Sequence, residues 1–144
     1  MRVVLQRCRT ASVSVDGQVV GAIGTGLVAL VGIGHSDDEA LVDAVADKTA
    51  ALRIFSDDVG KMNRSVVDVD GDVLVISQFT LLADCRRGRR PAFTDAAPPD
   101  QASRLVDRYA ERLRQTGMQV PTGIFGADMQ VQLINDGPVT IVLP

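Results

Sequence analysis

Hydrophobic and polar residues alternate with a period of two at residues 12–15 and again at 129–133, a pattern that is typical of β-strands. Residues 2–15 and 19–23 both read as extended, and the Asp16-Gly17 pair between them is a turn signal, so we expect a β-hairpin. The continuous apolar run 27–33 predicts a strand that is buried on both faces. The N-terminal part of the chain is therefore expected to form β-structure throughout.

The middle of the chain gives a weaker pattern. The Asp-Gly pair at 70–71 joins the short apolar runs 66–67 and 73–76, which predicts a second hairpin. Residues 55–65 and 84–98 show neither strand nor helix periodicity, so both are expected to be loops.

Two segments have apolar residues at helical spacing. Ser36 and Glu39 form a capping-box pattern before the first helix, whereas Pro98-Pro99 opens the second and Gly117 stops it. The two apolar stripes are Leu41, Val42, Val45, Thr49 and Leu52, and Leu105, Val106, Tyr109, Ala110 and Leu113. Several hairpins with only two helices predict a single α+β domain rather than repeated βαβ units.

The last extended segment contains a local conflict. Met129, Val131 and Leu133 alternate with glutamines and are expected to point inward. Further along, Asp-Gly gives a hairpin signal, but Pro138 follows Gly137 directly and removes a ladder donor. Such conflicts between local signals tend to mark functional sites.

Composition and charge narrow the classes of function. Aromatic residues make up 3% of the 144 residues, and the net charge is −3, so binding of nucleic acid over a broad basic surface is not expected. A local basic patch remains: Arg86, Arg87, Arg89 and Arg90 lie within five residues of a loop. Guanidinium groups suit phosphate contacts, although a solvated surface loop is an equal alternative.

Few residues suit metal or triad chemistry. The one histidine, His35, reads as a loop residue beside a helix cap, and Cys8 and Cys85 match no metal or redox spacing. We therefore expect no metal and no cofactor. The N-terminal segment lacks signal-peptide features and no apolar run reaches membrane-spanning length, so we expect a soluble, cytoplasmic protein.

Polar side chains gather at the end of the strand 73–76. In Ser77-Gln78-Phe79-Thr80, Thr80 could be a nucleophile, Gln78 an amide donor, and the local backbone N–H groups an oxyanion site. Thr80 has no obvious activating base in the sequence, so a satisfied hydroxyl at a strand end is the alternative reading.

Six segments, taken together, resemble the D-aminoacyl-tRNA deacylase family over essentially the whole chain. They are Leu5-Gln6-Arg7, Gly60-Lys61-Met62-Asn63, Ser77-Gln78-Phe79-Thr80-Leu81, Arg89-Arg90-Pro91-Ala92-Phe93, Gly126-Ala127-Asp128-Met129 and Asn135-Asp136-Gly137-Pro138-Val139-Thr140. The third and the last contain the two signature motifs of that family. Two departures lie outside them: the chain ends without the common terminal aromatic residue, and Ala92 replaces a frequent serine.

The resemblance implies a homodimer with a barrel-like, largely antiparallel sheet and two helices, in which residues 1–144 form one deacylase domain. It implies that the Gly137-Pro138 peptide bond is cis and that this pair enters the active site of the partner subunit. There it would admit a D-residue and exclude an L side chain by steric clash. Glycine has no side chain to clash, so glycyl-tRNA is an expected second substrate.

The resemblance also assigns roles within the site. Ser77, Gln78, Phe79 and Thr80 would hold the terminal adenosine and the ester, while the 2′-hydroxyl of the tRNA takes part in the chemistry. Whether Thr80 acts as a nucleophile stays open. Two further groups of residues complete the site that the resemblance implies: Arg7, which braces the Gly-Pro loop, and Met129, Val139 and Thr140, which complete the pocket. Separately from the resemblance, the arginine-rich loop suggests a contact with tRNA phosphates through Arg86, Arg87, Arg89 and Arg90.

Two other functions remain open on the sequence alone. One is a nucleic-acid-binding module of the same fold without catalysis, which predicts tRNA binding without turnover. The other is a protein-only esterase that depends on Thr80, which predicts activity on esters that lack a 2′-hydroxyl.

Overall fold

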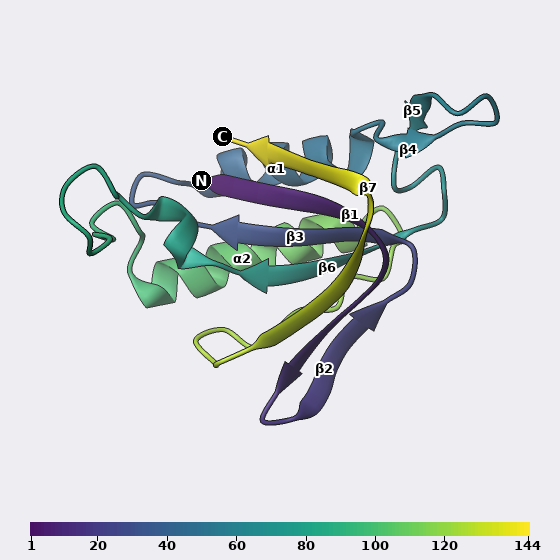
Figure 1. Ribbon diagram of the computed structural model, residues 1–144. Helices are drawn as coiled ribbons and strands as arrows, with labels where there is room; N and C mark the ends of the chain where they lie inside the picture. Colours follow the sequence, from purple (N-terminus) through teal and green to yellow (C-terminus); the bar gives the residue numbers. More distant parts are fainter.

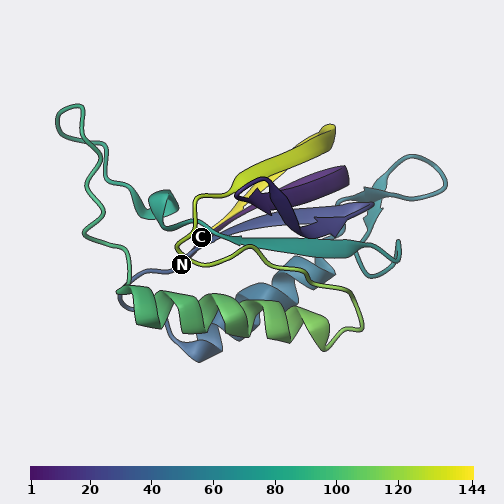
Figure 2. The same ribbon diagram turned by 90° about the horizontal axis from the view of Figure 1, so that it is seen from below.

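The computed structural model describes residues 1–144 and shows a curled β-sheet with two helices packed against one face (Figure 1). The strands are β1 (Arg2–Val15), β2 (Gln18–Ile23), β3 (Gly26–Gly32), β4 (Phe55–Ser56), β5 (Met62–Arg64), β6 (Asp72–Ser77) and β7 (Gln130–Leu143). The helices are α1 (Glu39–Ala51), the short 3₁₀ helix η1 (Phe79–Leu82) and α2 (Pro99–Arg114). Figure 2 shows both α-helices in one layer that covers one face of the sheet. The predicted α+β class is confirmed.

The long strand β1 organises the sheet because it pairs with three other strands. Its residues 2–8 pair with β3 and its residues 11–15 pair with β2, while β7 runs along β1 from residue 3 to residue 14. All these pairings are antiparallel, and β6 then joins β3 in parallel. Since β1 changes partner half-way along its length, the sheet curls into a half-barrel, which agrees with the predicted barrel-like arrangement.

The first predicted hairpin is confirmed. Asp16 and Gly17 connect β1 to β2 with φ angles of 51° and 77°, the pair of positive values that a type I′ turn requires. The predicted strand 27–33 corresponds to β3, which is buried along nearly all of its length between β1 and β6.

The second predicted hairpin is wrong. Ser65 and Asp68 each accept a hydrogen bond from the backbone N–H of the other, so the residues after Ser65 form a tight turn instead of a strand. The Gly71 N–H then closes this turn on the Val66 carbonyl, at 2.9 Å. The predicted partner strand, residues 66–67, is only two residues long, whereas β6 forms six parallel residue pairs with β3. The predicted loop 55–65 also differs, since it contains the small antiparallel pair β4 and β5.

The start of α1 corrects the predicted cap. Asp38, not Ser36, precedes the helix, and its carboxylate accepts a hydrogen bond from the Leu41 N–H at 2.8 Å. Leu41 itself is 40% exposed and lies outside the buried face, whereas Leu52, at the C-cap, packs partly buried against the core as predicted. Ala46 and Ala50 are buried on the same face of α1 as Val42, Val45 and Thr49.

The core lies mainly between the sheet and the helices. All five stripe residues predicted for α2 are buried there, and the Tyr109 hydroxyl is 2.7 Å from the hydroxyl of Thr49. Burial raises the pKa of Tyr109, because its phenolate would lose its hydration. A smaller apolar cluster covers part of the opposite face, where Met129 and Leu133 pack partly buried. Val131, which was predicted to point inward, is 38% exposed.

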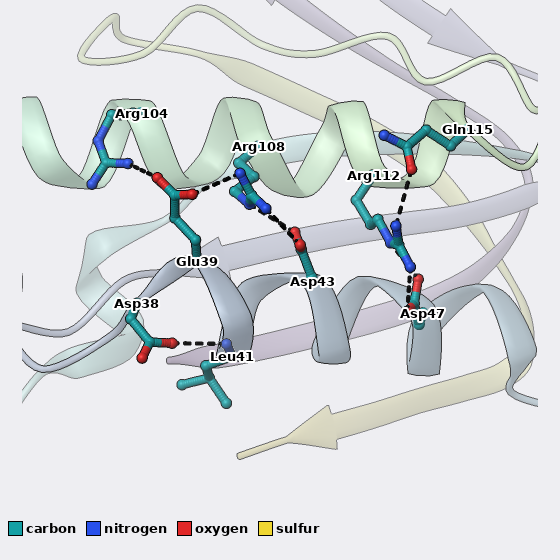
Figure 3. A network of polar contacts seen from close by, with 9 residues as sticks. All are labelled: Asp38, Glu39, Leu41, Asp43, Asp47, Arg104, Arg108, Arg112 and Gln115. Atoms are coloured by element: carbon teal, nitrogen blue, oxygen red, sulfur yellow. Dashed lines mark hydrogen bonds and ion pairs between the residues drawn. The ribbon is translucent and has the colours of Figure 1, made fainter.

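A row of ion pairs joins the outer faces of α1 and α2 (Figure 3). Arg108 lies 2.8 Å from Glu39 and 2.6 Å from Asp43, and Arg112 lies 2.7 Å from Asp47; Arg104 also pairs with Glu39. Hydrogen bonds from Arg108 and Arg112 lower the pKa of the Asp43 and Asp47 carboxyls below the ordinary value of 3.8. The row therefore stabilises the packing of the two helices as long as both carboxyls are ionised.

These lowered pKa values predict how stability depends on pH. A carboxyl with a lowered pKa in the folded state stabilises the protein above its unfolded pKa, and this contribution is lost as the pH falls through the folded value. In urea titrations, we expect the unfolding midpoint of the Asp43→Asn/Asp47→Asn double variant to fall less steeply below pH 3.8 than that of the wild type. Parallel curves for the two proteins would contradict this prediction.

No helix of the structure is both long enough and apolar enough to cross a membrane.

Candidate active site

The Ser77–Thr80 segment lies at the end of β6, where the chain leaves the sheet. The Gln78 N–H still donates to the Val31 carbonyl at 2.8 Å, and η1 then turns the chain away. Phe79 is 55% exposed, and the side-chain amide of Gln78 contacts the Thr80 hydroxyl. Polar groups are thus presented at the sheet end, as the sequence indicated.

Gly32 sets how closely η1 approaches the sheet. A Cβ atom at this position would lie 2.5 Å from Cδ2 of Leu82 and 2.9 Å from the Gln78 carbonyl oxygen. The packing of η1 against β3 therefore requires a residue without a side chain at position 32.

An apolar cavity of about 530 Å³ opens beside this segment. Phe79 lies at one wall, and its ring meets that of Phe93 edge to face with the centroids 5.0 Å apart. Phe125 and the α2 residues Ala102 and Val106 line other parts of the cavity. None of these except Phe79 was selected from the sequence as a site residue, because they lie far apart along the chain. The only available signal was Phe93, within a segment shared with the deacylase family.

His35 also lines this cavity, but the loop holds its ring. His35 Nε2 is 2.8 Å from the Thr94 carbonyl oxygen, so this nitrogen carries the proton and donates it. The hydrogen bond of the Thr80 side chain is to Gln78, an amide that is not a base. The site can therefore bind and orient a substrate, whereas Thr80 lacks the activating partner that a nucleophilic hydroxyl needs. No group of three or more metal-ligating side chains is gathered in the structure.

The Gly-Pro pair lies in a wide bulge of β7. Asn135 is opposite Cys8 and Thr140 is opposite Gln6, so the chain takes five steps along β7 against two along β1. Four residues of β7, 136–139, therefore lie unpaired between these two positions, where β1 has only Arg7, and the Gly137-Pro138 pair is exposed within this bulge. The peptide bond between the two residues is cis. The conflicting turn signal thus marks an interruption of a strand and not a hairpin turn.

Arg7 binds the bulge at Asp136, the residue directly before Gly137. Its Nε donates to the Asp136 carbonyl oxygen at 3.0 Å, and its Nη1 donates to the Ile54 carbonyl oxygen at 2.6 Å. The guanidinium carbon lies 5.9 Å from the centre of the Phe55 ring, and the residue is 8% exposed. Arg7 therefore links the bulge to the segment that leads into β4.

The two signature segments lie far apart within one chain. Across this part of the sheet the strand order is β7-β1-β3-β6, and Ser77, at the end of β6, is paired with Val31 of β3. Three strand spacings separate β6 from β7, which amounts to about 14 Å across the sheet. In Figure 1, η1 lies near one end of the sheet and β7 bends towards the other. Of the other predicted pocket residues, Met129 is close to β6, because a Cβ added at Gly123 would meet both Met129 and Ile76.

The remaining predicted pocket residues lie with the bulge. Val139 is 8% exposed and packs in the core between the sheet and the helices. Thr140 is exposed, and its hydroxyl lies 3.3 Å from the side-chain nitrogens of both Gln6 and Asn135.

The arginine segment, residues 84–92, follows η1 and extends away from the body of the protein, as Figure 2 shows. Reciprocal backbone hydrogen bonds between Asp84 and Ala92, at 2.8 and 3.0 Å, join its two ends. Arg86 pairs with Asp84, which lowers the pKa of that carboxyl through hydrogen bonds to the guanidinium. The other three arginines, Arg87, Arg89 and Arg90, are exposed and outside the ion pairs of the structure. The loop predicted for residues 84–98 is confirmed, and its arginines are exposed.

Comparison with known proteins gives matches over the whole chain. The family model described as D-Tyr-tRNA(Tyr) deacylase matches residues 4–144. A D-aminoacyl-tRNA deacylase of Rhodopirellula baltica is 69% identical over 143 residues, which cover 99% of both chains. A protein of the same name from Bacillus cereus is 60% identical, covering 99% of this chain and 98% of its own.

Two solved structures resemble the fold. A c-Myc DNA Unwinding Element Binding Protein superposes with a TM-score of 0.93 at 40% identity, over 100% of this chain and 98% of its own. A probable eukaryotic D-amino acid tRNA deacylase superposes with a TM-score of 0.88 at 17% identity, over 99% of this chain and 97% of its own. At that identity the second match supports the fold alone.

Proposed function

Since the chain belongs to the D-Tyr-tRNA(Tyr) deacylase family, we propose that it hydrolyses the ester bond of D-aminoacyl-tRNA and releases free tRNA and the D-amino acid. The observation that carries this proposal is the 69% identity over 99% of both chains with a D-aminoacyl-tRNA deacylase. The Ser77–Thr80 segment, in which Phe79 and Thr80 are exposed, and the exposed Gly137-Pro138 pair are the parts of this chain that would meet the substrate. All of residues 1–144 would act as one deacylase domain in the cytoplasm.

The active form is proposed to be a homodimer with sites at the interface. Within one chain, about 14 Å of sheet separates β6 from β7, so Gly137-Pro138 cannot face its own Ser77–Thr80 segment closely. A second copy of the chain could supply the missing wall. The Gly-Pro pair is suited to this role because it is exposed in a bulge that Arg7 holds in place.

Discrimination between D- and L-residues would be steric. The backbone at Gly137-Pro138 would receive the amino group of the substrate and leave no space for a side chain in the L configuration. Rejection by clash can be strong even where the two substrates share every other contact. Glycyl-tRNA lacks a side chain, so it would also be cleaved.

The chemistry would depend on the RNA and on the backbone. In ester hydrolysis, the acyl carbon forms a bond to the oxygen of water, the bond to the ribose oxygen breaks, and that oxygen takes up a proton. The N–H groups near Phe79 and Thr80 would stabilise the oxyanion, while Ser77 and Gln78 position the terminal adenosine. The 2′-hydroxyl of the tRNA would assist the water in place of a protein nucleophile. No metal or cofactor is invoked.

The decisive experiment compares matched D- and L-tyrosyl-tRNA as substrates of the purified protein, with glycyl-tRNA alongside. Rapid loss of the D-ester and of glycyl-tRNA, while the L-ester persists, is the expected result. Equal cleavage of both tyrosyl esters would overturn the steric filter. An absence of cleavage, with tRNA still bound, would overturn the proposed activity.

A function in binding alone is the second candidate. It is favoured by the 40% identity with a protein described as binding a DNA element. The turnover assay separates the two functions, because a binding module would retain tRNA without releasing the amino acid. The third reading, an esterase that depends on Thr80, predicts unchanged cleavage when the terminal adenosine lacks its 2′-hydroxyl, whereas the proposed chemistry predicts a large loss.

The arginine segment is proposed to contact tRNA phosphates. It begins directly after η1, and Phe93 near its other end packs on Phe79 of the candidate site. Replacing Arg87, Arg89 and Arg90 by glutamine is expected to reduce the slope of log affinity against log salt by about 0.7–0.9 for each lost contact. The measurement is tRNA binding at several salt concentrations.

A control for this variant is Lys48→Gln, which removes one exposed charge from the last turn of α1. We expect its salt dependence to match the wild type, and we expect the triple variant to keep its preference for D-esters. A salt slope that is unchanged in the triple variant would contradict the phosphate contact.

A further inference from the structure

The side chain of Asn135 spans the bulge that contains the Gly-Pro pair. Its Oδ1 accepts a hydrogen bond from the Val139 N–H at 3.1 Å, and its Nδ2 donates to the Thr140 hydroxyl oxygen at 3.3 Å. Gln6, on the adjacent strand β1, donates to the same oxygen at 3.3 Å. One side chain at the entry of the bulge thus bonds to both residues that follow Gly137-Pro138.

These side-chain hydrogen bonds replace the backbone hydrogen bonds between β1 and β7 that are missing within the bulge. Residues 136–139 lie between the last pair before the bulge, Asn135 with Cys8, and the first pair after it, Thr140 with Gln6. The Val139 N–H therefore has no position opposite it on β1, and Val139 is 8% exposed. A buried N–H without an acceptor is costly, so the Asn135 amide oxygen stabilises this particular path of the chain.

The position of Val139 determines the space around Gly137. A Cβ atom on Gly137 would lie 3.0 Å from the Val139 nitrogen and 2.8 Å from its Cγ2. A shift of the Val139 backbone by a few tenths of an ångström would therefore change the contacts of Gly137 directly. Arg7 holds the opposite side of the bulge at the Asp136 carbonyl, 3.0 Å from its Nε.

We propose that Asn135 is a positioning residue for the discrimination between D- and L-aminoacyl-tRNA. It fixes the exit of the bulge, as Arg7 fixes the entry, and so holds Gly137-Pro138 in one orientation. Asn135 itself need not touch the substrate. The inference rests on the proposed function, because the orientation of the pair matters only if it forms the steric filter.

The test compares two variants of Asn135 with the wild type. Asn135→Leu has a similar volume but no hydrogen-bonding group, whereas Asn135→Asp keeps an acceptor for the Val139 N–H, and the Thr140 hydroxyl can rotate to donate to it. For each protein, kcat/KM is measured with D-tyrosyl-tRNA and with L-tyrosyl-tRNA. We expect the D-to-L ratio to fall by about tenfold or more in Asn135→Leu, which corresponds to about 1.4 kcal/mol, and to stay near the wild-type ratio in Asn135→Asp.

The matched control is Gln132→Leu, which lies on the same strand, is exposed, and pairs with Ser12 outside the bulge. Its D-to-L ratio is expected to equal that of the wild type. If Asn135→Leu does not fold, as judged by its thermal transition, Asn135→Ser serves instead, because its hydroxyl is too short to bridge to Val139.

The outcomes separate this inference from the proposed function. A wild type that cleaves neither ester would overturn the proposed activity, and one that cleaves both equally would overturn the proposed steric filter. A selective wild type with equally selective Asn135→Leu would overturn only the role of Asn135. An equal loss of selectivity in Gln132→Leu would do the same, because it would show a general sensitivity of β7.

Discussion

Replacing Gly137 by alanine is expected to reduce kcat/KM for D-tyrosyl-tRNA by about a hundredfold or more, the scale that follows when reacting groups are displaced by about an ångström. Gly137 has a φ angle of 136°, which L side chains rarely adopt. A methyl group there would also lie 2.8 Å from Cγ2 of Val139. The bulge must therefore move, and the pair that is proposed to receive the amino group moves with it.

A suitable control is Gly117→Ala, beyond the end of α2. Gly117 also has a positive φ, of 93°, but a Cβ atom at this position meets nothing within 4 Å. This variant is expected to lose about 1–3 kcal/mol of stability from backbone strain and to keep its activity. If Gly137→Ala retained the kcat/KM of the wild type, the bulge could not be the steric filter.

Replacing Arg7 by methionine is expected to affect both stability and activity. The variant loses the donors to the Asp136 and Ile54 carbonyls, which lie 3.0 and 2.6 Å from the guanidinium. Arg7 is buried, so these carbonyls would lose partners that water does not readily replace. We expect the free energy of unfolding to fall by about 2–4 kcal/mol, as measured by urea titration. The activity towards D-tyrosyl-tRNA should fall as well, because Asp136 directly precedes Gly137.

Arg9 provides the matched comparison, because it contacts the same residue from the surface. Its Nε lies 3.1 Å from the Asp136 carboxylate, and its side chain is 72% exposed. Arg9→Met is expected to cost less than about 1 kcal/mol, the usual limit for an exposed ion pair. Similar losses in Arg7→Met and Arg9→Met would contradict the bracing role of Arg7, since burial and the two carbonyl contacts distinguish it from Arg9.

The elements with strong local signals were predictable from the sequence. The hairpin turn at Asp16-Gly17 requires positive φ at two adjacent residues, and the Asp-Gly pair satisfies that requirement locally. The apolar stripe of α2 has a clear helical period, and all five predicted residues are buried. Each signal depends on residues that are close to one another in the sequence, so no knowledge of distant partners is needed to interpret it.

The errors arose where distant pairing overrides a local signal. The Asp70-Gly71 pair resembles the first hairpin, yet β6 pairs with β3 in parallel and the reciprocal bonds of Ser65 and Asp68 form a turn instead. The cap of α1 was misplaced by two residues, because Ser36 and Asp38 are both good capping residues and only the path of the chain selects Asp38.

For the candidate site, the two motifs, the family and the anomaly at Gly137-Pro138 could all be recognised in the sequence. Their positions in space could not: the pair lies in a bulge of β7, and the Ser77–Thr80 segment lies three strands away beside an apolar cavity. The tertiary structure also revealed that Asn135 and Arg7 hold the two sides of the bulge. The difference lies in how far apart along the chain the interacting residues are. Turn and helix signals act between near neighbours, whereas strand register, cavities and the contacts of Arg7 depend on residues brought together only by folding.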